Sequence, residues 1–259
     1  MGTVLHGKYS LYYEVKGQGS RSIILIHGLC GNHEVWSKTI SAFSNGYKVI
    51  TLDMFGHGNS SNKIPPKEAF DSMPEMIAKI IEKEGLEKVV LVGHSIAGNI
   101  LCKCIEGNLK NVCGYVFVDC TFNASKRVVN SRNRLADSLI GSSSEQTNLK
   151  MVAWYKTMMD MNAQGEDNKI VLSALENLDG KWIVDFLKAT NFVRQPPKID
   201  LPVAIFESDW LTRDEPERSF HNAVPHTVYH HWPVQNHFFF IYGAQKFNFE
   251  LQKFLDRVL

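Results

Sequence analysis

The 259-residue sequence predicts an α/β fold, in which a mostly parallel sheet is flanked by helices. Short, continuously apolar runs of strand length alternate with stretches of helical periodicity. Polar residues follow directly after several of these runs, namely His27, Asp53, Ser95 and Asp119. Because the carboxyl ends of parallel strands meet at one edge of a sheet, we expect these four residues to lie near one another.

The first half of the chain alternates regularly between the two kinds of element. Strands are predicted at 9–15, 22–26, 47–52, 88–92 and 115–118, and helices at 33–43, 74–84 and from residue 99. Each helix presents an apolar face, and Gly85 suits the carboxyl end of the second one. This order implies right-handed crossovers between parallel strands.

The alternation lapses between residues 121 and 197, where strand-like runs are absent. Met151, Trp154, Tyr155 and Met158 follow the i, i+3, i+4, i+7 spacing of a helix face. We therefore predict a helical cap inserted at 121–197, with Trp154 or Met158 facing a cavity beneath it. Residues 1–120 and 198–259 are predicted to form the core domain around it.

Strand composition returns after the predicted cap. Strands are predicted at 201–206 and 227–230, a helix near 215–223, and a final helix whose apolar face includes Phe247, Leu251, Phe254 and Leu255. The loop that contains His237 lies between the last strand and the last helix.

Composition restricts the partners that we expect. The formal net charge is +1, which argues against nucleic acid or an anionic membrane as a partner. No apolar run approaches the roughly 20 residues that span a bilayer. The odd number of cysteines and the lack of a signal-peptide pattern predict a cytoplasmic protein with reduced thiols. We expect a monomer or homodimer with a small hydrophobic substrate and neither metal nor cofactor, since no phosphate-binding glycine loop or metal-ligand spacing is present.

Ser95 lies in the stretch Gly93-His94-Ser95-Ile96-Ala97-Gly98, between a predicted strand and a predicted helix. Strand and helix approach closely at such a turn, so small residues are needed two positions before and after the serine. Gly93 and Ala97 meet this requirement. The pattern is that of a nucleophile elbow, with alanine in place of the second glycine.

Four segments, in this order, resemble those of the α/β-hydrolase superfamily over nearly the whole chain. His27-Gly28 with Trp36 resembles the oxyanion-loop segment, and residues 53–60 resemble the D-x-x-G-x-G-x-S loop. Residues 93–98 resemble the nucleophile elbow, and Asn236-His237-Phe238 resembles the catalytic-histidine loop. The resemblance implies a serine hydrolase with an α/β-hydrolase fold.

The resemblance also implies roles for individual residues. Ser95 would be the nucleophile, His237 the base and Asp209 the acid, with Asp119 as the alternative acid that some relatives use. The oxyanion hole would consist of the backbone N–H groups of Ile96 and of Leu29, or of Cys30 in place of Leu29. Candidates for the substrate pocket are His27, Cys30, His94, Trp154, Met158, Trp210 and Phe238.

A serine nucleophile favours hydrolysis of an ester, lactone or thioester through an acyl-enzyme. The expected substrate is small to medium in size and hydrophobic. Three alternatives use the same residues: a carbon–carbon bond hydrolase, a non-hydrolytic member such as a lyase or a cofactor-free dioxygenase, and a ligand receptor with slow turnover.

Overall fold

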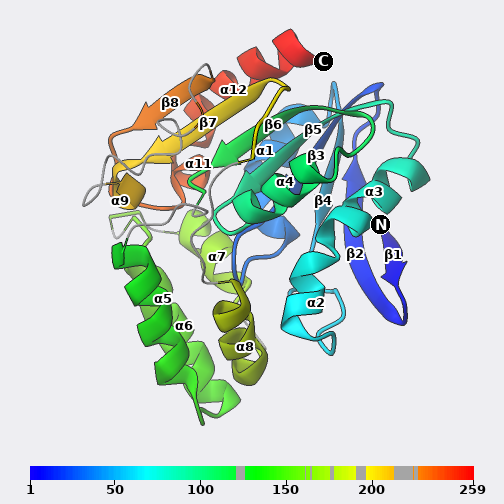
Figure 1. Cartoon of the computed structure of the whole chain (residues 1–259). Helices are drawn as coiled ribbons and strands as arrows, with labels where there is room; N and C mark the ends of the chain where they lie inside the picture. Colours follow the sequence, from blue (N-terminus) through cyan, green and yellow to red (C-terminus); the bar gives the residue numbers. More distant parts are fainter. Residues whose placement is uncertain are drawn as a thin grey trace.

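The computed structural model describes residues 1–120, 126–160, 162–163, 165–175, 178–190, 197–212, 224 and 227–259. These residues contain an eight-stranded sheet with the order β1-β2-β4-β3-β5-β6-β7-β8 (Figure 1). The strands from β3 onward pair in parallel, which confirms the predicted mostly parallel sheet. They are β3 (Arg21–Ile26), β4 (Lys48–Leu52), β5 (Lys88–His94), β6 (Val112–Val118), β7 (Val203–Ser208) and β8 (Val228–Trp232).

An antiparallel hairpin extends one edge of this sheet. Its strands are β1 (Gly2–His6) and β2 (Tyr9–Lys16), and β2 also pairs antiparallel with β4. The sequence analysis did not predict β1, because Val4 is its one buried side chain and its apolar signal is correspondingly weak. Gly7 has φ +56° in the connecting turn, a conformation that glycine adopts at little cost.

Helices cover the sheet on both faces. In Figure 1, α4 (Ala97–Glu106) lies in front of the sheet, whereas α1 (Ser37–Phe43) and α12 (Ala244–Val258) lie behind it. The other helices of the core are α2 (Pro66–Asp71), α3 (Met73–Lys83), α9 (Asp209–Thr212) and α11 (Phe239–Tyr242). The helix predicted at 33–43 begins as a 3₁₀ turn, His33–Trp36, whose first residues are capped by the Asn32 side chain. The helix predicted near 215–223 lies outside the described residues.

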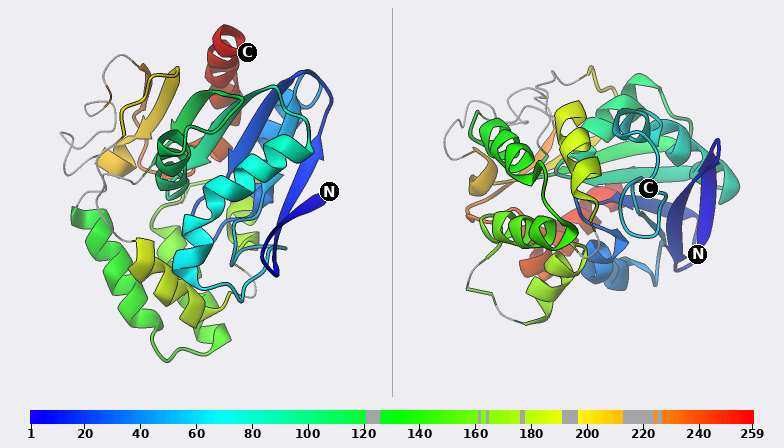
Figure 2. Two further views of the ribbon diagram at one scale, coloured as in Figure 1. Left: turned by 45° about the vertical axis from the view of Figure 1, so that its right-hand side comes forward. Right: turned by 90° about the horizontal axis from the view of Figure 1, so that it is seen from below.

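The described part of the segment between β6 and β7 is helical, as predicted. It contains α5 (Lys126–Leu139), α6 (Ser144–Lys156), α7 (Glu166–Ser173) and α8 (Gly180–Thr190). Figure 1 shows α5, α6 and α8 grouped below the sheet, and the right view of Figure 2 shows them in front of it when seen from below. We refer to α5–α8 as the cap; the predicted first residue of the insertion, Thr121, lies outside the described residues.

The cap is joined to the core by polar contacts as well as by apolar packing. The Trp182 indole donates to the carbonyl of Ile64 at 2.9 Å. Lys38 on α1 forms an ion pair with Asp167 on α7, with 2.6 Å between Nζ and Oδ1. These contacts tie two cap helices to different parts of the core.

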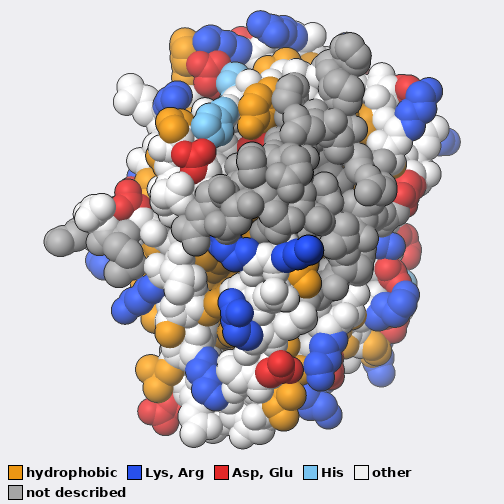
Figure 3. All heavy atoms as spheres, turned by 60° about the vertical axis from the view of Figure 1, so that its left-hand side comes forward, with side chains coloured by type: hydrophobic (Ala, Val, Ile, Leu, Met, Phe, Trp, Pro, Cys, Tyr) orange, Lys and Arg blue, Asp and Glu red, His pale blue; other side chains and the backbone are white. Residues whose placement is uncertain are grey.

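The surface carries charges of both signs. On the face that Figure 3 shows, Lys and Arg side chains are interspersed with Asp and Glu side chains over the lower half. None of the helices in the described residues combines the length and the apolar composition that a membrane crossing requires.

Candidate functional site

Ser95 lies on a tight turn between β5 and α4. Its φ of +57° is the left-handed conformation, which is strained for a residue other than glycine. The turn is packed so closely that a Cβ at Gly98 would lie 2.5 Å from the Cβ of Cys120. A Cβ at Gly93 would lie 3.2 Å from the Cβ of Ala97, so the second small residue of the predicted elbow closes the same turn. The sharp strand-to-helix turn predicted at the serine is therefore present.

The hydroxyl of Ser95 lies within hydrogen-bond distance of His237, with 2.8 Å between Oγ and Nε2. The other ring nitrogen of His237 lies 2.7 Å from Oδ2 of Asp119. All three side chains are buried. The serine hydroxyl, the imidazole and the carboxyl thus form a continuous chain of hydrogen bonds.

The prediction that Asp209 is the hydrogen-bond partner of His237 is wrong. Asp209 lies instead 2.7 Å from Nε2 of His231, and both of these side chains are partly exposed. Asp119, the alternative, occupies the position beside His237. The sequence analysis chose between two carboxylates that each follow a strand, and strand position alone did not separate them.

The direction of side chains at the end of β7 explains this outcome. Strand β7 ends at Ser208, and Asp209 is the first residue of the short helix α9. Ser208 contacts Asp119: its backbone N–H and its hydroxyl donate to the two oxygens of Asp119, each at 2.7 Å. Asp209 points toward β8, where His231 lies.

The electrostatic environment favours a neutral imidazole. Burial, together with the positive charges of Arg132 and Arg127, lowers the pKa of His237 to about 3. Burial also raises the pKa of Asp119, whereas the two hydrogen bonds from Ser208 oppose this rise by stabilising the carboxylate. An imidazole that is neutral above acidic pH is able to accept a proton from Ser95.

His94 supports His237 from the side of β5. Its Nε2 donates to the backbone carbonyl of His237 at 3.0 Å, and the two ring centroids lie 4.5 Å apart. Burial and the proximity of His237 hold the pKa of His94 well below its usual value, so its ring is neutral. A Cβ at Gly28 would lie 2.9 Å from Nδ1 of His94, which explains why glycine occupies position 28.

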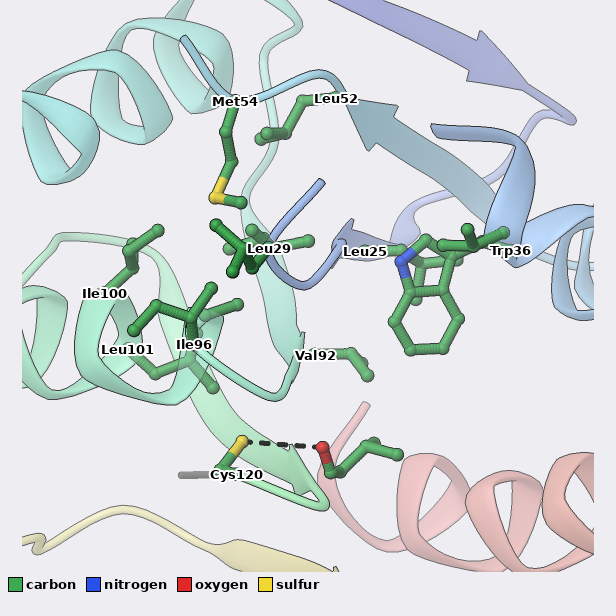
Figure 4. Packing of buried hydrophobic residues seen from close by; sticks show 14 of the residues in the cluster. Leu25, Leu29, Trp36, Leu52, Met54, Val92, Ile96, Ile100, Leu101 and Cys120 are labelled. Carbon is green, nitrogen blue, oxygen red and sulfur yellow. Dashed lines mark hydrogen bonds between the residues drawn. The ribbon is translucent and has the colours of Figure 1, made fainter. Parts of the chain in front are cut away.

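The peptide group between Gly28 and Leu29 has a fixed orientation. The carbonyl of Gly28 accepts hydrogen bonds from Nδ1 of His27 at 2.7 Å and from the N–H of Gly31 at 3.1 Å. In a trans peptide the N–H points opposite to the carbonyl, so the N–H of Leu29 points away from these two donors. In Figure 4 the Leu29 side chain lies between Met54 and Ile96, and this apolar packing holds the loop in place.

Two residues of the cap contact the loop that contains His237 and the loop after β3. The hydroxyl of Tyr155 donates to the carbonyl of Leu29, and its ring stacks on Phe238. The carbonyl of Met158 accepts a hydrogen bond from the N–H of His237 at 2.7 Å. The cap therefore helps to position the backbone on both sides of Ser95.

A cavity of about 20 Å³ lies beside Ser95 and His237. This volume accommodates about one water molecule, so a larger ligand requires the surrounding side chains or helices to move. Five of the predicted pocket candidates line the cavity: His94, Trp154, Met158, Trp210 and Phe238. The prediction that Trp154 or Met158 faces a cavity under the cap is met by both residues.

The other two pocket candidates, His27 and Cys30, do not line this cavity. Nε2 of His27 accepts a hydrogen bond from the N–H of Met54, while Nδ1 donates to Gly28, so both ring nitrogens bind the backbone. Cys30 is buried with φ +51°, and burial raises the pKa of its thiol above the usual range. Both residues therefore support the loop after β3 and do not contact the cavity.

Three further residues line the cavity that the sequence analysis did not name as pocket candidates: Val128, Arg132 and Tyr155. The sequence contains one feature that could have identified Arg132 as a pocket residue. Arg132 occupies the i+4 position after Val128 and precedes Leu135 and Leu139, so one charged residue interrupts an otherwise apolar helix face. Within the described residues, no group of histidine, cysteine and carboxylate side chains has the arrangement of a metal site.

Comparisons with known proteins concern the fold of this chain. Residues 21–119 match the family described as "alpha/beta hydrolase fold". Among curated proteins, "Putative carbamate hydrolase RutD" of Yersinia enterocolitica is 31% identical over 93 residues. That match covers 35% of this chain and 34% of the relative, so it spans about a third of the relative's length.

The similarity to solved structures extends over the whole chain. A thermophilic esterase from Thermogutta terrifontis has a TM-score of 0.81 at 15% identity, covering 100% of this chain and 99% of that one. A bromoperoxidase from Bacillus anthracis has a TM-score of 0.80 at 19% identity, covering 96% of each chain. At these identities the likeness concerns the fold, and this chain has the fold that those proteins share.

Proposed function

Because residues 21–119 match the α/β-hydrolase fold family and the whole chain has that fold, we propose that it is a serine hydrolase that cleaves an ester, lactone or thioester of a small to medium hydrophobic substrate. The observation that carries this proposal is the hydrogen-bonded series Ser95–His237–Asp119, in which Ser95 follows β5, Asp119 follows β6 and His237 lies after β8. The proposal differs from the sequence-based hypothesis in its acid, which is Asp119 and not Asp209.

The distances support a two-step acyl transfer. Ser95 Oγ attacks the substrate carbonyl while its proton passes to Nε2 of His237, 2.8 Å away. The same proton then passes to the leaving oxygen or sulfur, and the acyl group remains on Ser95. In the second step a water molecule attacks the acyl-enzyme, with His237 again accepting and returning the proton. This step releases the carboxylic acid product and restores the Ser95 hydroxyl. Asp119 holds the imidazole in the tautomer that presents an unprotonated Nε2 to the serine.

We assign the oxyanion hole to the backbone N–H groups of Ile96 and Leu29. Ile96 directly follows the nucleophile, and Gly28 and Leu29 line the cavity beside it. The orientation of the Gly28–Leu29 peptide supports Leu29 over Cys30. The carbonyl of Leu29 is bound to Tyr155, so the N–H of Cys30, on the same peptide, points away from that hydroxyl.

Turnover of short p-nitrophenyl esters and covalent labelling by a fluorophosphonate together test this proposal. A hydrolase should give both steady-state turnover and labelling. Labelling with a single turnover would favour the ligand receptor. The absence of both turnover and labelling would favour a non-hydrolytic member of the fold.

The pH dependence provides a second test. Because burial lowers the pKa of His237 to about 3, its base form persists well below the ordinary histidine pKa of 6.5. We expect kcat/KM for a neutral ester at about pH 5.5 to stay within about twofold of its value at about pH 7.5. The measurement is a pH profile of kcat/KM, with released product quantified by chromatography. An acid limb with its midpoint near 6.5 would contradict this expectation.

Tyr155→Phe should lower kcat by about tenfold and change KM less, since one buried hydrogen bond is lost from the Leu29 carbonyl. The ring stacked on Phe238 is retained, so the cap packing should persist. Steady-state kinetics with a p-nitrophenyl ester, together with a thermal melt, provide the measurement. An unchanged kcat would mean that the Tyr155 hydroxyl does not position the oxyanion loop.

A further inference from the structure

Trp154 on α6 forms part of the cavity wall, and its ring is held by contacts on two sides. The indole N–H donates to the hydroxyl of Ser131 on α5 at 2.9 Å. The ring also lies edge-to-face against Tyr155, with 5.7 Å between the two centroids. Tyr155 is itself fixed by its hydrogen bond to the carbonyl of Leu29 and by its stacking on Phe238. The Trp154 ring is therefore not free to swing out of the cavity wall without losing these contacts.

Trp154 also lies between the cavity and the surface. Of the described residues that line the cavity beside Ser95, Trp154 alone is partly exposed, whereas the others are buried. A side chain that faces a cavity and is also exposed to solvent separates the two. A substrate chain that grows longer than the cavity would therefore meet the indole before it reaches solvent on this side.

The surroundings of His237 indicate which part of a substrate lies against Trp154. The leaving oxygen or sulfur takes its proton from Nε2 of His237, so the leaving group must lie next to that ring. Met158 contacts this side of the site, because its carbonyl accepts a hydrogen bond from the N–H of His237 at 2.7 Å. Trp154 is tied instead to α5 through Ser131. The acyl chain points away from the leaving group, and this arrangement directs it toward Trp154.

We propose that Trp154 limits the length of the acyl chain, so that the preferred substrates are esters or thioesters of acetyl or similarly short acyl groups. This inference rests on the proposed function and narrows its substrate class. The cavity of about 20 Å³ accommodates about one water molecule, so among acyl groups it suits the smallest. Each further methylene has to displace an indole that Ser131 and Tyr155 hold in place.

The test compares p-nitrophenyl acetate with p-nitrophenyl hexanoate. The leaving group is the same in both esters, so its accommodation cancels from the ratio of their kcat/KM values. For the unmodified protein we expect kcat/KM for the acetate to exceed that for the hexanoate by about tenfold or more. Trp154→Ala should lower this ratio by about 10- to 100-fold, because removal of the indole leaves space for the longer chain. Trp154→Phe should lower it less, since a smaller ring remains.

Leu149→Ala is the matched control, since Leu149 is an exposed apolar residue of the same helix and should leave the ratio unchanged. A preference of the unmodified protein for the hexanoate would overturn the proposal. An unchanged ratio in Trp154→Ala would also overturn it, because a purely structural role lowers the rates with both esters together. If Trp154→Ala does not fold, the ratio in Trp154→Phe decides in the same way.

A second pair of esters tests the assignment to the acyl side. Ethyl acetate and hexyl acetate vary the leaving group and keep the acyl group constant. The ratio of their kcat/KM values should be the same in Trp154→Ala and in the unmodified protein. A larger change in this ratio than in the acyl-chain ratio would place the leaving group against Trp154 and overturn the proposal.

A binding measurement separates this inference from the proposed function. Ser95→Ala is titrated calorimetrically with two amides that keep the shape of the esters, N-(4-nitrophenyl)acetamide and N-(4-nitrophenyl)hexanamide. Ser95→Ala/Trp154→Ala should gain affinity for the hexanamide relative to the acetamide. This gain without turnover of any ester by the unmodified protein would disprove the hydrolase and retain the role of Trp154. Turnover with an acyl-chain ratio that Trp154→Ala does not change would retain the hydrolase and disprove that role. The absence of both the gain and turnover would disprove both.

Discussion

Ser95→Ala should reduce hydrolysis of p-nitrophenyl esters by about 10⁴-fold or more and should abolish covalent labelling by a fluorophosphonate. The hydroxyl of Ser95 lies 2.8 Å from Nε2 of His237, so its removal takes away both the nucleophile and the proton donor of the first step. The measurement is initial rate with a sensitive ester, combined with mass spectrometry of the labelled protein.

The control for this prediction is Ser41→Ala, which replaces an exposed serine on α1 and should change neither the rate nor the labelling. Alanine at position 95 must adopt the same left-handed conformation as the serine, with φ +57°, so the backbone strain is similar in both proteins. A thermal melt of the variant checks that the fold is retained. Full labelling of Ser95→Ala would identify a different serine as the nucleophile.

Asp119→Asn should have the second largest effect. An amide at this position places an N–H group opposite Nδ1 of His237, which favours the tautomer with a proton on Nε2. That nitrogen is then unable to accept the proton of Ser95. In a serine triad of another fold the equivalent loss is about 10⁴-fold, and we expect a loss of several orders of magnitude here.

Asp209→Asn is the matched comparison, because Asp209 also follows a strand of the sheet. Its carboxylate pairs with His231 and is partly exposed, so we expect the rate to fall by less than about threefold. Both variants are compared by kcat/KM on one ester, with thermal melts to verify equal folding. A greater loss in Asp209→Asn than in Asp119→Asn would restore the sequence-based assignment and contradict the hydrogen-bond geometry.

Features that depend on neighbouring residues could be predicted from local sequence patterns. The apolar runs are buried strands of the sheet, and the lapse in their alternation marks the helices α5–α8. Gly93 and Ala97 around Ser95 predicted the tight turn, because side chains larger than these do not fit where strand and helix meet. Periodicity and steric size act over a few residues, and a sequence records them directly.

Contacts between groups that are far apart in the chain depend on tertiary packing. Asp119 and Asp209 both follow strands, and the choice between them depended on their distant partners: Asp119 lies beside Ser208 and His237, whereas Asp209 lies beside His231. Arg132 gave a weak signal as a charge within an apolar helix face, but its place beside Ser95 depends on how α5 packs over the sheet. Such pairings join residues far apart in the chain, and their geometry follows from packing, which no local pattern of residues encodes.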